Sequence, residues 1–223
     1  MRSLDIADGV RLLDAALLAL LKTPRDRSAP EASELRRAVG AFLAGAGLAL
    51  ARCSFGADLG ACFDLALGAG ATREGLALVR KGVMDAAPAT PGGEIVRQAI
   101  LVQGVAREAL ALAAGVYTSQ AETEALMLSM NDVFDGLIEF AADHQSHESY
   151  NTLIALHAAL AADMTARGRT LPDMVSYAFP GSRPTLWISN RLYGDADHSA
   201  DIARENRIGH PLFAPATGRA LTR

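Results

Sequence analysis

The residues best suited to chemistry are metal-ligand types that gather between positions 143 and 148. They are Asp143, His144, His147 and Glu148. Two histidines three positions apart can share one face of a helix and bind one metal ion. Ser146 lies between them, at a position typical of a helix start, so the cluster also fits a solvated turn between two helices. We favour the turn and predict no metal site.

No familiar catalytic pattern occurs elsewhere. The sequence contains no Gly-x-Ser-x-Gly, no His-Glu-x-x-His and no evident motif of paired carboxylates. His157 falls on an apolar stripe, where a histidine satisfied by its neighbours is commoner than a ligand, and His198 is expected on an exposed helix. Gly40, Gly45 and Gly47 are followed by no Gly-Lys-Ser/Thr, so we interpret them as sites of close helix packing rather than a phosphate loop. We expect no enzymatic activity and no cofactor.

Composition describes a folded chain with little charge bias. The chain has 223 residues, of which 50% are hydrophobic, and a formal net charge of −4. This length allows one large or two small domains with a true core. The mixed charges exclude a single-sign field for nucleic acid or anionic lipid. Cys53 and Cys62 match neither a disulfide scaffold nor a zinc pattern, which favours a reducing cytoplasm.

Neither an export signal nor a membrane span is expected. Asp5, Asp8 and Asp14 interrupt the apolar character of the N-terminus. The most apolar run, 38–51, is shorter than the about 20 residues that a membrane helix needs. We interpret it as a buried helix.

The stretch from Leu171 to Arg223 carries the most specific pattern. The β-branched and aromatic run Val175–Phe179 predicts a strand, and the prolines after it predict a turn. Thr185 can then cap a short helix, and Gly194 suits the left-handed residue that ends one. The expected buried side of this helix carries Trp187, Ile188, Leu192 and Tyr193.

A second short helix and a return strand complete this module. Asp195 or Asp197 can cap the helix, and Asn206 tolerates the positive φ of a helix end. Ile208 and Leu221 are expected in short strands. The sum is a strand, helix, helix, strand unit of about fifty residues, which is small for an independent core.

Two resemblances rest on these residues. The segments 186–195 and 202–208 (LWISNRLYGD and IARENRI) resemble a LysM module, a small βααβ fold best known for binding peptidoglycan or chitin. A closer similarity is to the C-terminal part of the DNA circularisation protein family of Mu-like phages, whose members are tail and baseplate components. The similar segments are AADMTARG at 161–168, RLYGDA at 191–196, NRI at 206–208 and HPLFAP at 210–215. It covers roughly Asn151 to Leu221.

The resemblance implies a structural role in a phage or phage-like tail, assembled in the cytoplasm of a bacterial host. The expected protein is a ring component near the baseplate hub, a homo-oligomer of six-fold symmetry that links the tail tube to the central hub. Its helices would contact other copies or a tape-measure protein. Trp187 and Tyr193 are expected mainly in the core of the module. The residues expected at interfaces are Tyr177, Phe179, Trp187, Arg191, Tyr193, Arg207, His210 and Phe213.

Two other binding functions compete with this one. A peptidoglycan-binding LysM protein would need an open groove between the loops of the module. A DNA-end-binding or circularisation protein would need a basic patch, but residues 183–223 hold six arginines against four acids. An excess of two cations supports little phosphate binding, because affinity grows with the number of phosphates neutralised.

The residues before the module predict helices that must position it. Apolar spacing predicts helices over 4–22, 57–67 and 73–86, and a helix after a capping box of Ser28 and Glu31. Three long helices should follow, starting at Thr90-Pro91, at Ser119 with Glu122, and at Ser146, the last ending at Gly168. The apolar face predicted for the first of these carries Ile95, Val102, Ala106, Ala109, Leu112 and Val116.

The predicted fold is therefore mainly α, an antiparallel helical bundle followed by a small α+β module of the LysM-like βααβ type. The predicted domains are 1–170, with a candidate sub-boundary near 88–93, and 171–223.

Overall fold

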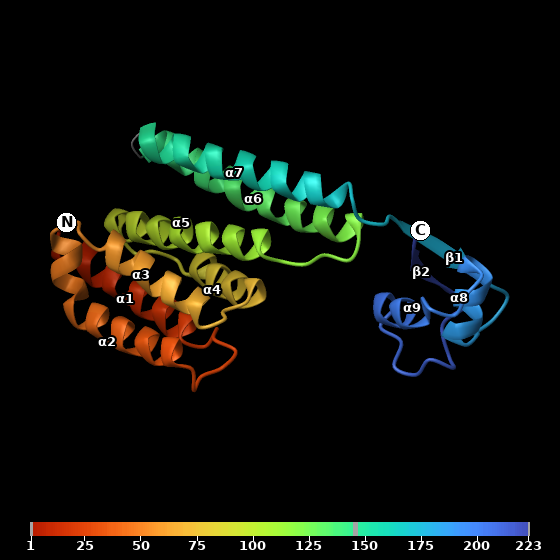
Figure 1. Cartoon of the computed structure of the whole chain (residues 1–223). Helices are drawn as coiled ribbons and strands as arrows, with labels where there is room; N and C mark the ends of the chain where they lie inside the picture. The colour runs from red at the N-terminus through yellow and green to blue at the C-terminus, as the bar shows by residue number, and fades with distance from the viewer. Residues whose placement is uncertain (1, 145–146, 223) are drawn as a thin grey trace. The chain divides into compact units, whose positions relative to one another are not determined.

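The computed structural model describes residues 2–144 and 147–222, apart from the side chain of Glu148. This part of the chain forms nine helices and two strands (Figure 1). The prediction of a mainly helical chain with a small C-terminal sheet is confirmed. The helices are α1 (Ser3–Leu20), α2 (Pro30–Ala51), α3 (Gly56–Gly68), α4 (Arg73–Asp85), α5 (Pro91–Ala113), α6 (Gln120–His144), α7 (His147–Gly168), α8 (Thr185–Tyr193) and α9 (Ser199–Glu205); the strands are β1 (Met174–Ala178) and β2 (Thr217–Leu221).

The chain divides into two compact units. The first runs to Gly115 and includes Phe134–Leu156, and the second comprises Val116–Val133 and His157–Arg223. The division crosses α6 and α7, and so differs in position from the predicted boundary between 170 and 171. Each unit is described by itself below.

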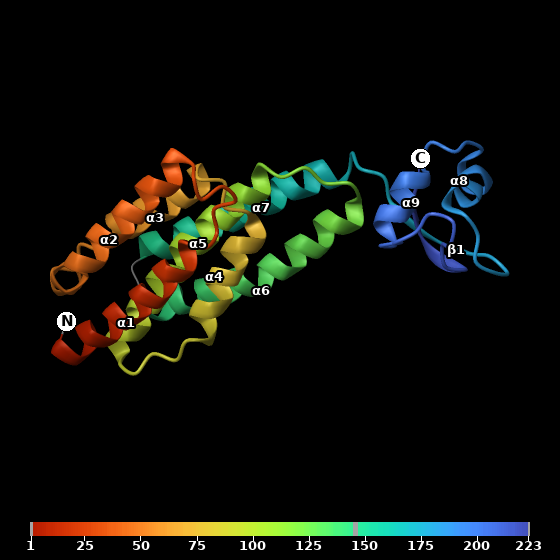
Figure 2. The same ribbon diagram turned by 90° about the horizontal axis from the view of Figure 1, so that it is seen from below.

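In the first unit, α1 is the helix around which the others gather. It packs against α2, α4 and α5, and α5 also packs against α3 and α4 (Figures 1 and 2). Leu13, Leu17 and Leu20 recur at helical spacing on α1 and are fully buried. Leu35 and Leu50 of α2 and Phe63 of α3 are buried in the same unit.

Two predicted helix starts have different outcomes. The start of α5 is confirmed, because Thr90 Oγ1 accepts a hydrogen bond from Gly93 N at 2.9 Å and Pro91 is the first helical residue. The capping box at Ser28 is wrong. Ser28 donates instead to Asp26 Oδ1, from its N–H at 2.8 Å and its hydroxyl at 2.6 Å, and α2 begins at Pro30 without a side-chain cap.

Two predictions about packing faces are only partly right. On α5, Ala109 and Leu112 are buried as predicted, but Ile95 is 55% and Val116, just beyond the helix, 92% exposed, and Val96, Ile100 and Val105 are buried instead. Apolar residues occur nearly all round this helix, so sequence spacing alone did not determine its phase. Close packing also fails at Gly40 and Gly45 of α2, because a Cβ built on either would meet no atom within 4 Å.

A buried carboxylate ties α1 to the start of α5. Asp8 is 6% exposed, and its Oδ2 accepts hydrogen bonds from Ala89 N at 2.7 Å and Thr90 N at 2.9 Å. Its Oδ1 accepts from Arg11 Nη2 at 2.7 Å. Only glycine fits at position 93, because a Cβ there would collide with the Asp8 carboxylate. The segment 88–93, a candidate sub-boundary in the sequence, therefore lies inside the first unit.

In the second unit, α6 and α7 run antiparallel, as predicted. His157 Nε2 and Asn131 Oδ1 form a hydrogen bond of 2.8 Å, and a Cβ on Gly168 would come within 2.7 Å of Thr123 Oγ1. His157 is thus a satisfied, half-buried histidine. Ser119 Oγ accepts from Glu122 N at 3.2 Å, so the predicted cap forms, but the Glu122 carboxylate accepts from Thr118 and not from Ser119, so the predicted capping box is only half formed.

The C-terminal residues of the second unit form β1, α8, α9 and β2 in that order. The strands pair antiparallel, with Ser176 opposite Arg219. Tyr177, Ile188, Ile202, Ala214 and Ala220 form a small buried core between the sheet and the helices. This order is the predicted one.

Some local predictions in this module need correction. Ile208 packs against the small core but belongs to no strand, whereas Leu221 ends β2. Thr185 is the first residue of α8 rather than its cap, and neither Asp195 nor Asp197 caps α9. The positive φ after α9 belongs to Arg207, at 50°, and not to Asn206, whereas the left-handed Gly194 is confirmed at 84°.

Asp8 predicts a pH-dependent contribution to stability. Burial alone would raise the pKa of its carboxyl, but the hydrogen bonds from Arg11, Ala89 and Thr90 outweigh burial and hold it below the ordinary 3.8. A carboxyl with a lowered folded pKa stabilises the fold above its unfolded pKa, and this is lost as the pH falls through the folded pKa.

We expect Asp8→Ala to lower the free energy of unfolding at pH 7 by about 2–3 kcal/mol, because two backbone N–H groups lose a charged acceptor. The difference from wild type should shrink as the pH falls below 3.8. Denaturant unfolding across this pH range measures it. Asp14→Ala, an exposed aspartate on the same helix, is the matched control. Equal effects of the two substitutions would contradict the assignment.

Candidate interaction site

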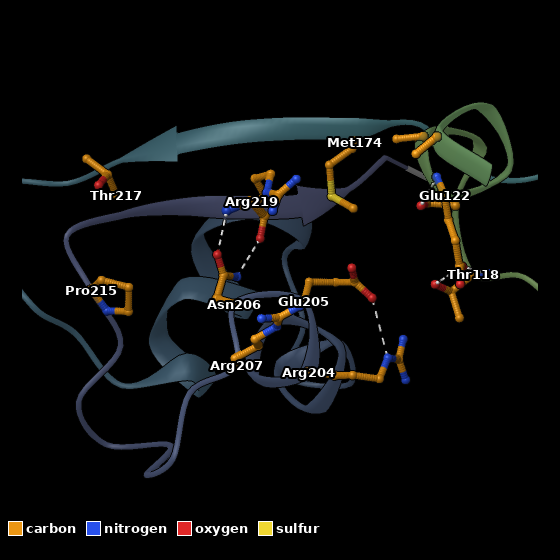
Figure 3. Close-up of a pocket in the computed structure, with 13 residues that line it drawn as sticks. Thr118, Glu122, Met174, Arg204, Glu205, Asn206, Arg207, Pro215, Thr217 and Arg219 are labelled. Atoms are coloured by element: carbon orange, nitrogen blue, oxygen red, sulfur yellow. Dashed lines mark hydrogen bonds and ion pairs between the residues drawn. The ribbon is translucent and has the colours of Figure 1, made fainter. Parts of the chain in front are cut away.

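An open groove of about 850 Å³ lies in the second unit, beside the outer edge of β2 (Figure 3). One wall comes from the start of α6, including Thr118 just before it and Glu122. The other comes from the end of α9 and from β2. Arg204, Arg207 and Arg219 line it together with Glu205 and Met174. Cationic side chains from both α9 and β2 therefore meet one solvent-filled space.

Two of these arginines keep an uncompensated charge. Arg204 pairs with Asp201 at 2.9 Å and with Glu205 at 3.4 Å. Within residues 2–144 and 147–222, the guanidinium groups of Arg207 and Arg219 make no hydrogen bond or ion pair. Both residues are exposed. Glu122 is occupied, because its Oε2 accepts from Thr118 N at 2.9 Å.

The backbone at the end of α9 explains the placement of Arg207. Ile208 N donates to Ala203 O at 2.9 Å and Arg207 N to Arg204 O at 3.1 Å. This pair of bonds is the Schellman motif, which requires a left-handed residue and usually has glycine there. Arg207 occupies that position at φ 50°, at some conformational cost. The strained position holds a cation at the groove.

Asn206 closes the outer edge of β2. Its Oδ1 accepts from Arg219 N at 2.7 Å, and its Nδ2 donates to Arg219 O at 2.7 Å and to Ile202 O at 2.8 Å (Figure 3). An amide side chain thus pairs with the strand as a neighbouring backbone would. Sequence reasoning missed this role and the place of Arg219 in the groove. The only available signal was an asparagine just after a short helix.

Tyr193 closes the same edge at its far end. Its hydroxyl donates to Leu221 O at 2.6 Å, and its ring lies 4.5 Å from that of His198. The residue is half-buried, so its predicted place in the core holds in part. Its role is structural.

An aromatic row crosses the module from core to surface. The ring centroids of Tyr177 and Phe179 are 5.4 Å apart, and those of Phe179 and Trp187 are 5.1 Å apart, edge to face. Arg183 lies over the Trp187 ring at 5.3 Å. Tyr177 is 5% exposed, whereas Trp187 is 42% exposed, so the core prediction for Trp187 is wrong.

The inner end of this row carries a buried hydroxyl. Tyr177 Oη has no hydrogen-bond partner in the described part of the chain. Burial raises the pKa of this phenol above its ordinary value of 10.0. Tyr177 therefore stays neutral at physiological pH and acts as a core residue.

The loop 209–216, the pinned loop, carries His210 and Phe213 and is held in place by hydrogen bonds. Thr185 N donates to Pro211 O at 2.7 Å, and Ala214 N donates to Arg183 O at 3.0 Å. His210 Nδ1 accepts from Leu212 N at 3.3 Å, and its ring lies 5.4 Å from that of Phe213. Phe213 is nevertheless 72% exposed. The Phe213 ring is therefore held in a defined position while most of its surface is exposed to solvent.

The predicted interface residues therefore divide among separate places. Phe179 and Trp187 share the aromatic row, Arg207 lines the groove, and His210 and Phe213 share the pinned loop. Arg191 is exposed on α8, and no contact in the described part of the chain joins it to these groups. Tyr177 and Tyr193 hold the module together instead.

The residues considered for metal binding lie partly outside the described chain. Ser146 and the side chain of Glu148 are not described, and His144 and His147 are exposed near aromatic rings, Phe140 at 4.5 Å and Tyr150 at 6.4 Å. Among the described residues, no group of three or more His, Cys, Asp or Glu could hold a metal ion.

Neither cysteine adds to a site. Cys53 and Cys62 are both free thiols. Burial, with Asp58 nearby, raises the pKa of the Cys62 thiol to about 11, so it is protonated at neutral pH.

No protein-family model matches the chain, and no curated protein matches it. None of the helices in the described residues combines the length and apolar character that crossing a bilayer requires.

Asn206 yields a direct test of the closed edge. Asn206→Ala should destabilise the second unit by about 1–2 kcal/mol, because partly exposed backbone groups can recover some bonding from water. The amide of Arg219 should exchange its hydrogen faster, as NMR can measure. Asn190→Ala, an exposed asparagine on α8, should leave that rate unchanged. Unchanged protection in Asn206→Ala would argue against an edge-closing role.

The substitution Trp187→Ala tests whether Trp187 belongs to the core or to the exposed end of the aromatic row. With 42% of its surface exposed, Trp187→Ala should cost about 1–2 kcal/mol, less than the roughly 3–5 kcal/mol of a core tryptophan. Ile188→Ala, fully buried on the same helix, should cost about 2–5 kcal/mol. Denaturant unfolding compares the two. A larger loss at Trp187 than at Ile188 would return Trp187 to the core.

Proposed function

We propose that this protein is a non-enzymatic structural component of a phage or phage-like tail, a ring protein near the baseplate hub that links tail tube and central hub. The observation that carries the proposal is a small module that exposes rigidly held aromatic groups. Phe213 and Trp187 are exposed although the segments that bear them are fixed by hydrogen bonds and ring contacts. Such groups act as anchors at interfaces.

The residue pattern shared with the DNA circularisation family supports the same proposal. Gly194, Asn206 and Ile208, which belong to that pattern, end α8, close β2 and pack on the small core. The pattern thus coincides with the residues that build the module. The order of β1, α8, α9 and β2 supports a LysM-like fold for it.

Assembly would be the mechanism. Copies would close into a ring, six-fold to match a tail tube, because a head-to-tail interface is finite only when its rotation closes. The aromatic row and the pinned loop would meet the neighbouring ring, and the helices would contact other copies or a tape-measure protein. The protein would be found in the tail of the particle after assembly in the bacterial cytoplasm.

The two alternative binding functions have less support. The loops at 179–184 and 209–216, between which a carbohydrate would lie, are joined by the bridge between Arg183 and Ala214 and by Ser182 Oγ donating to Ala214 O at 2.7 Å. At the groove, Arg207 and Arg219 are too few arginines without an acidic partner among the described residues for strong phosphate binding. Protein partners therefore fit this surface better than a glycan or DNA.

Quantitative peptide mass spectrometry of purified tail particles tests the proposal. We expect this chain at a fixed ratio to tube and hub proteins, at about six copies per particle, as a closed six-fold ring requires. Trp187→Ala should lower that ratio, whereas Asn190→Ala should not. Absence of the chain from particles would refute the tail function, and retention of the full chain on peptidoglycan sacculi would then favour the LysM alternative.

A further inference from the structure

The two edges of the small sheet differ, and only one is closed. Phe179 N donates to Ala216 O and Thr222 N to Asp173 O, both at 2.7 Å, so the ladder bonds fall at the odd-numbered positions of β1. In an antiparallel pair, the intervening residues direct their N–H and C=O groups away from the partner strand. On β2 these are Thr217, Arg219 and Leu221; Asn206 binds both backbone groups of Arg219, and Tyr193 donates to the C=O of Leu221.

The outer edge of β1 has no such cover. Its outward residues are Met174, Ser176 and Ala178. The N–H of Met174 binds Asp173 Oδ1 at 2.7 Å, but in the described part of the chain no hydrogen bond uses its C=O or either backbone group of Ser176 and Ala178. Ser176 and Ala178 are exposed. Proteins usually blunt a free edge with lysine, proline or a bulge, and β1 has none of these.

We propose that β1 pairs with β1 of a second copy of this chain, in an antiparallel register centred on Ser176. A second copy offers its own β1 more readily than its β2, because Asn206 and Tyr193 already occupy the middle and one end of the β2 edge. In this register the two Ser176 residues exchange both backbone hydrogen bonds, and each Ala178 N–H donates to the other copy's Met174 C=O. The hydrogen bond that Met174 N donates to Asp173 Oδ1 is preserved.

The side chains of β1 are complementary to themselves in this register. Val175, which is 43% exposed, lies opposite the other copy's Tyr177 at a position where side chains approach closely. The Tyr177 ring is packed in its own core, so the apolar surface that this contact would bury is mainly that of Val175. No charged residue occurs between Met174 and Ala178, so no repulsion arises across the two-fold axis.

This inference goes beyond the proposed tail function and does not depend on it. A two-fold contact closes on itself and forms a dimer, so it is distinct from the head-to-tail contact by which a six-fold ring would close. A solution measurement on the purified full chain tests the pairing, whereas particle composition tests the tail function. The two can fail separately.

Light scattering of the full chain should give twice 23.4 kDa. Ser176→Pro removes an N–H that β2 does not use, so the chain should remain folded while its dimer dissociation constant rises by at least about tenfold. Circular dichroism checks the fold. A wild-type monomer, or a dimer that Ser176→Pro leaves unchanged, would overturn the proposal.

A charge exchange at the two-fold axis tests the register itself. Ser176→Lys and Ser176→Asp should each weaken the homodimer, by up to about fivefold, because each places two like charges opposite each other. An equimolar mixture of the two variants should recover a mixed dimer. Thr217→Lys, an exposed change on the same sheet face but on β2, should dimerise as wild type does. Failure of the mixture to associate more tightly than either variant would rule out this register.

Discussion

The side-chain amide of Asn206 substitutes for a third strand in the small sheet. By binding both backbone groups of Arg219 and the carbonyl of Ile202, it fastens β2 to the end of α9. Asn206 is bonded to Arg219 and directly precedes the left-handed Arg207. Its hydrogen bonds therefore help to position Arg207 and Arg219 at the groove. It also makes the sheet asymmetric, because one edge is satisfied from within the chain and the other is open. The groove and the difference between the two sheet edges both depend on this amide.

A similar use of a polar side chain organises the first unit. The carboxylate of Asp8 receives backbone N–H groups from the segment before α5, and Glu108, 1% exposed, receives Arg80 Nε at 2.8 Å across α4 and α5. In both units the local apolar spacing determines where the helices form. A polar side chain distant in sequence then holds two of the elements together. Buried polar groups need such partners, since an unsatisfied one costs more than a made bond contributes.

These distant partners mark the limit of prediction from sequence. Thr90-Pro91, Ser119 and Gly194 could be recognised because a helix end is decided by residues close to it. The buried face of α5 was mispredicted because its apolar residues surround the axis, and only the neighbouring helices select Val96 over Ile95. Trp187 is expected in the core because large aromatic rings usually are buried, whereas here Arg183 and Phe179 cover part of the ring and 42% of the residue stays exposed. The groove could not be predicted at all, since it joins residues about a hundred positions apart.

The path of the chain through α6 and α7 has a consequence for biosynthesis. Each unit is assembled from two separate stretches, with Val116–Val133 of the second preceding Phe134–Leu156 of the first. A ribosome must therefore translate to Leu156 before the first unit has all its residues, and to Leu221 before the whole of β2 can join β1. Neither unit can mature as an early, finished fragment. A truncated polypeptide ending after α5 would lack Phe134–Leu156 of the first unit and all of the second, and its exposed apolar surface would favour aggregation and proteolysis.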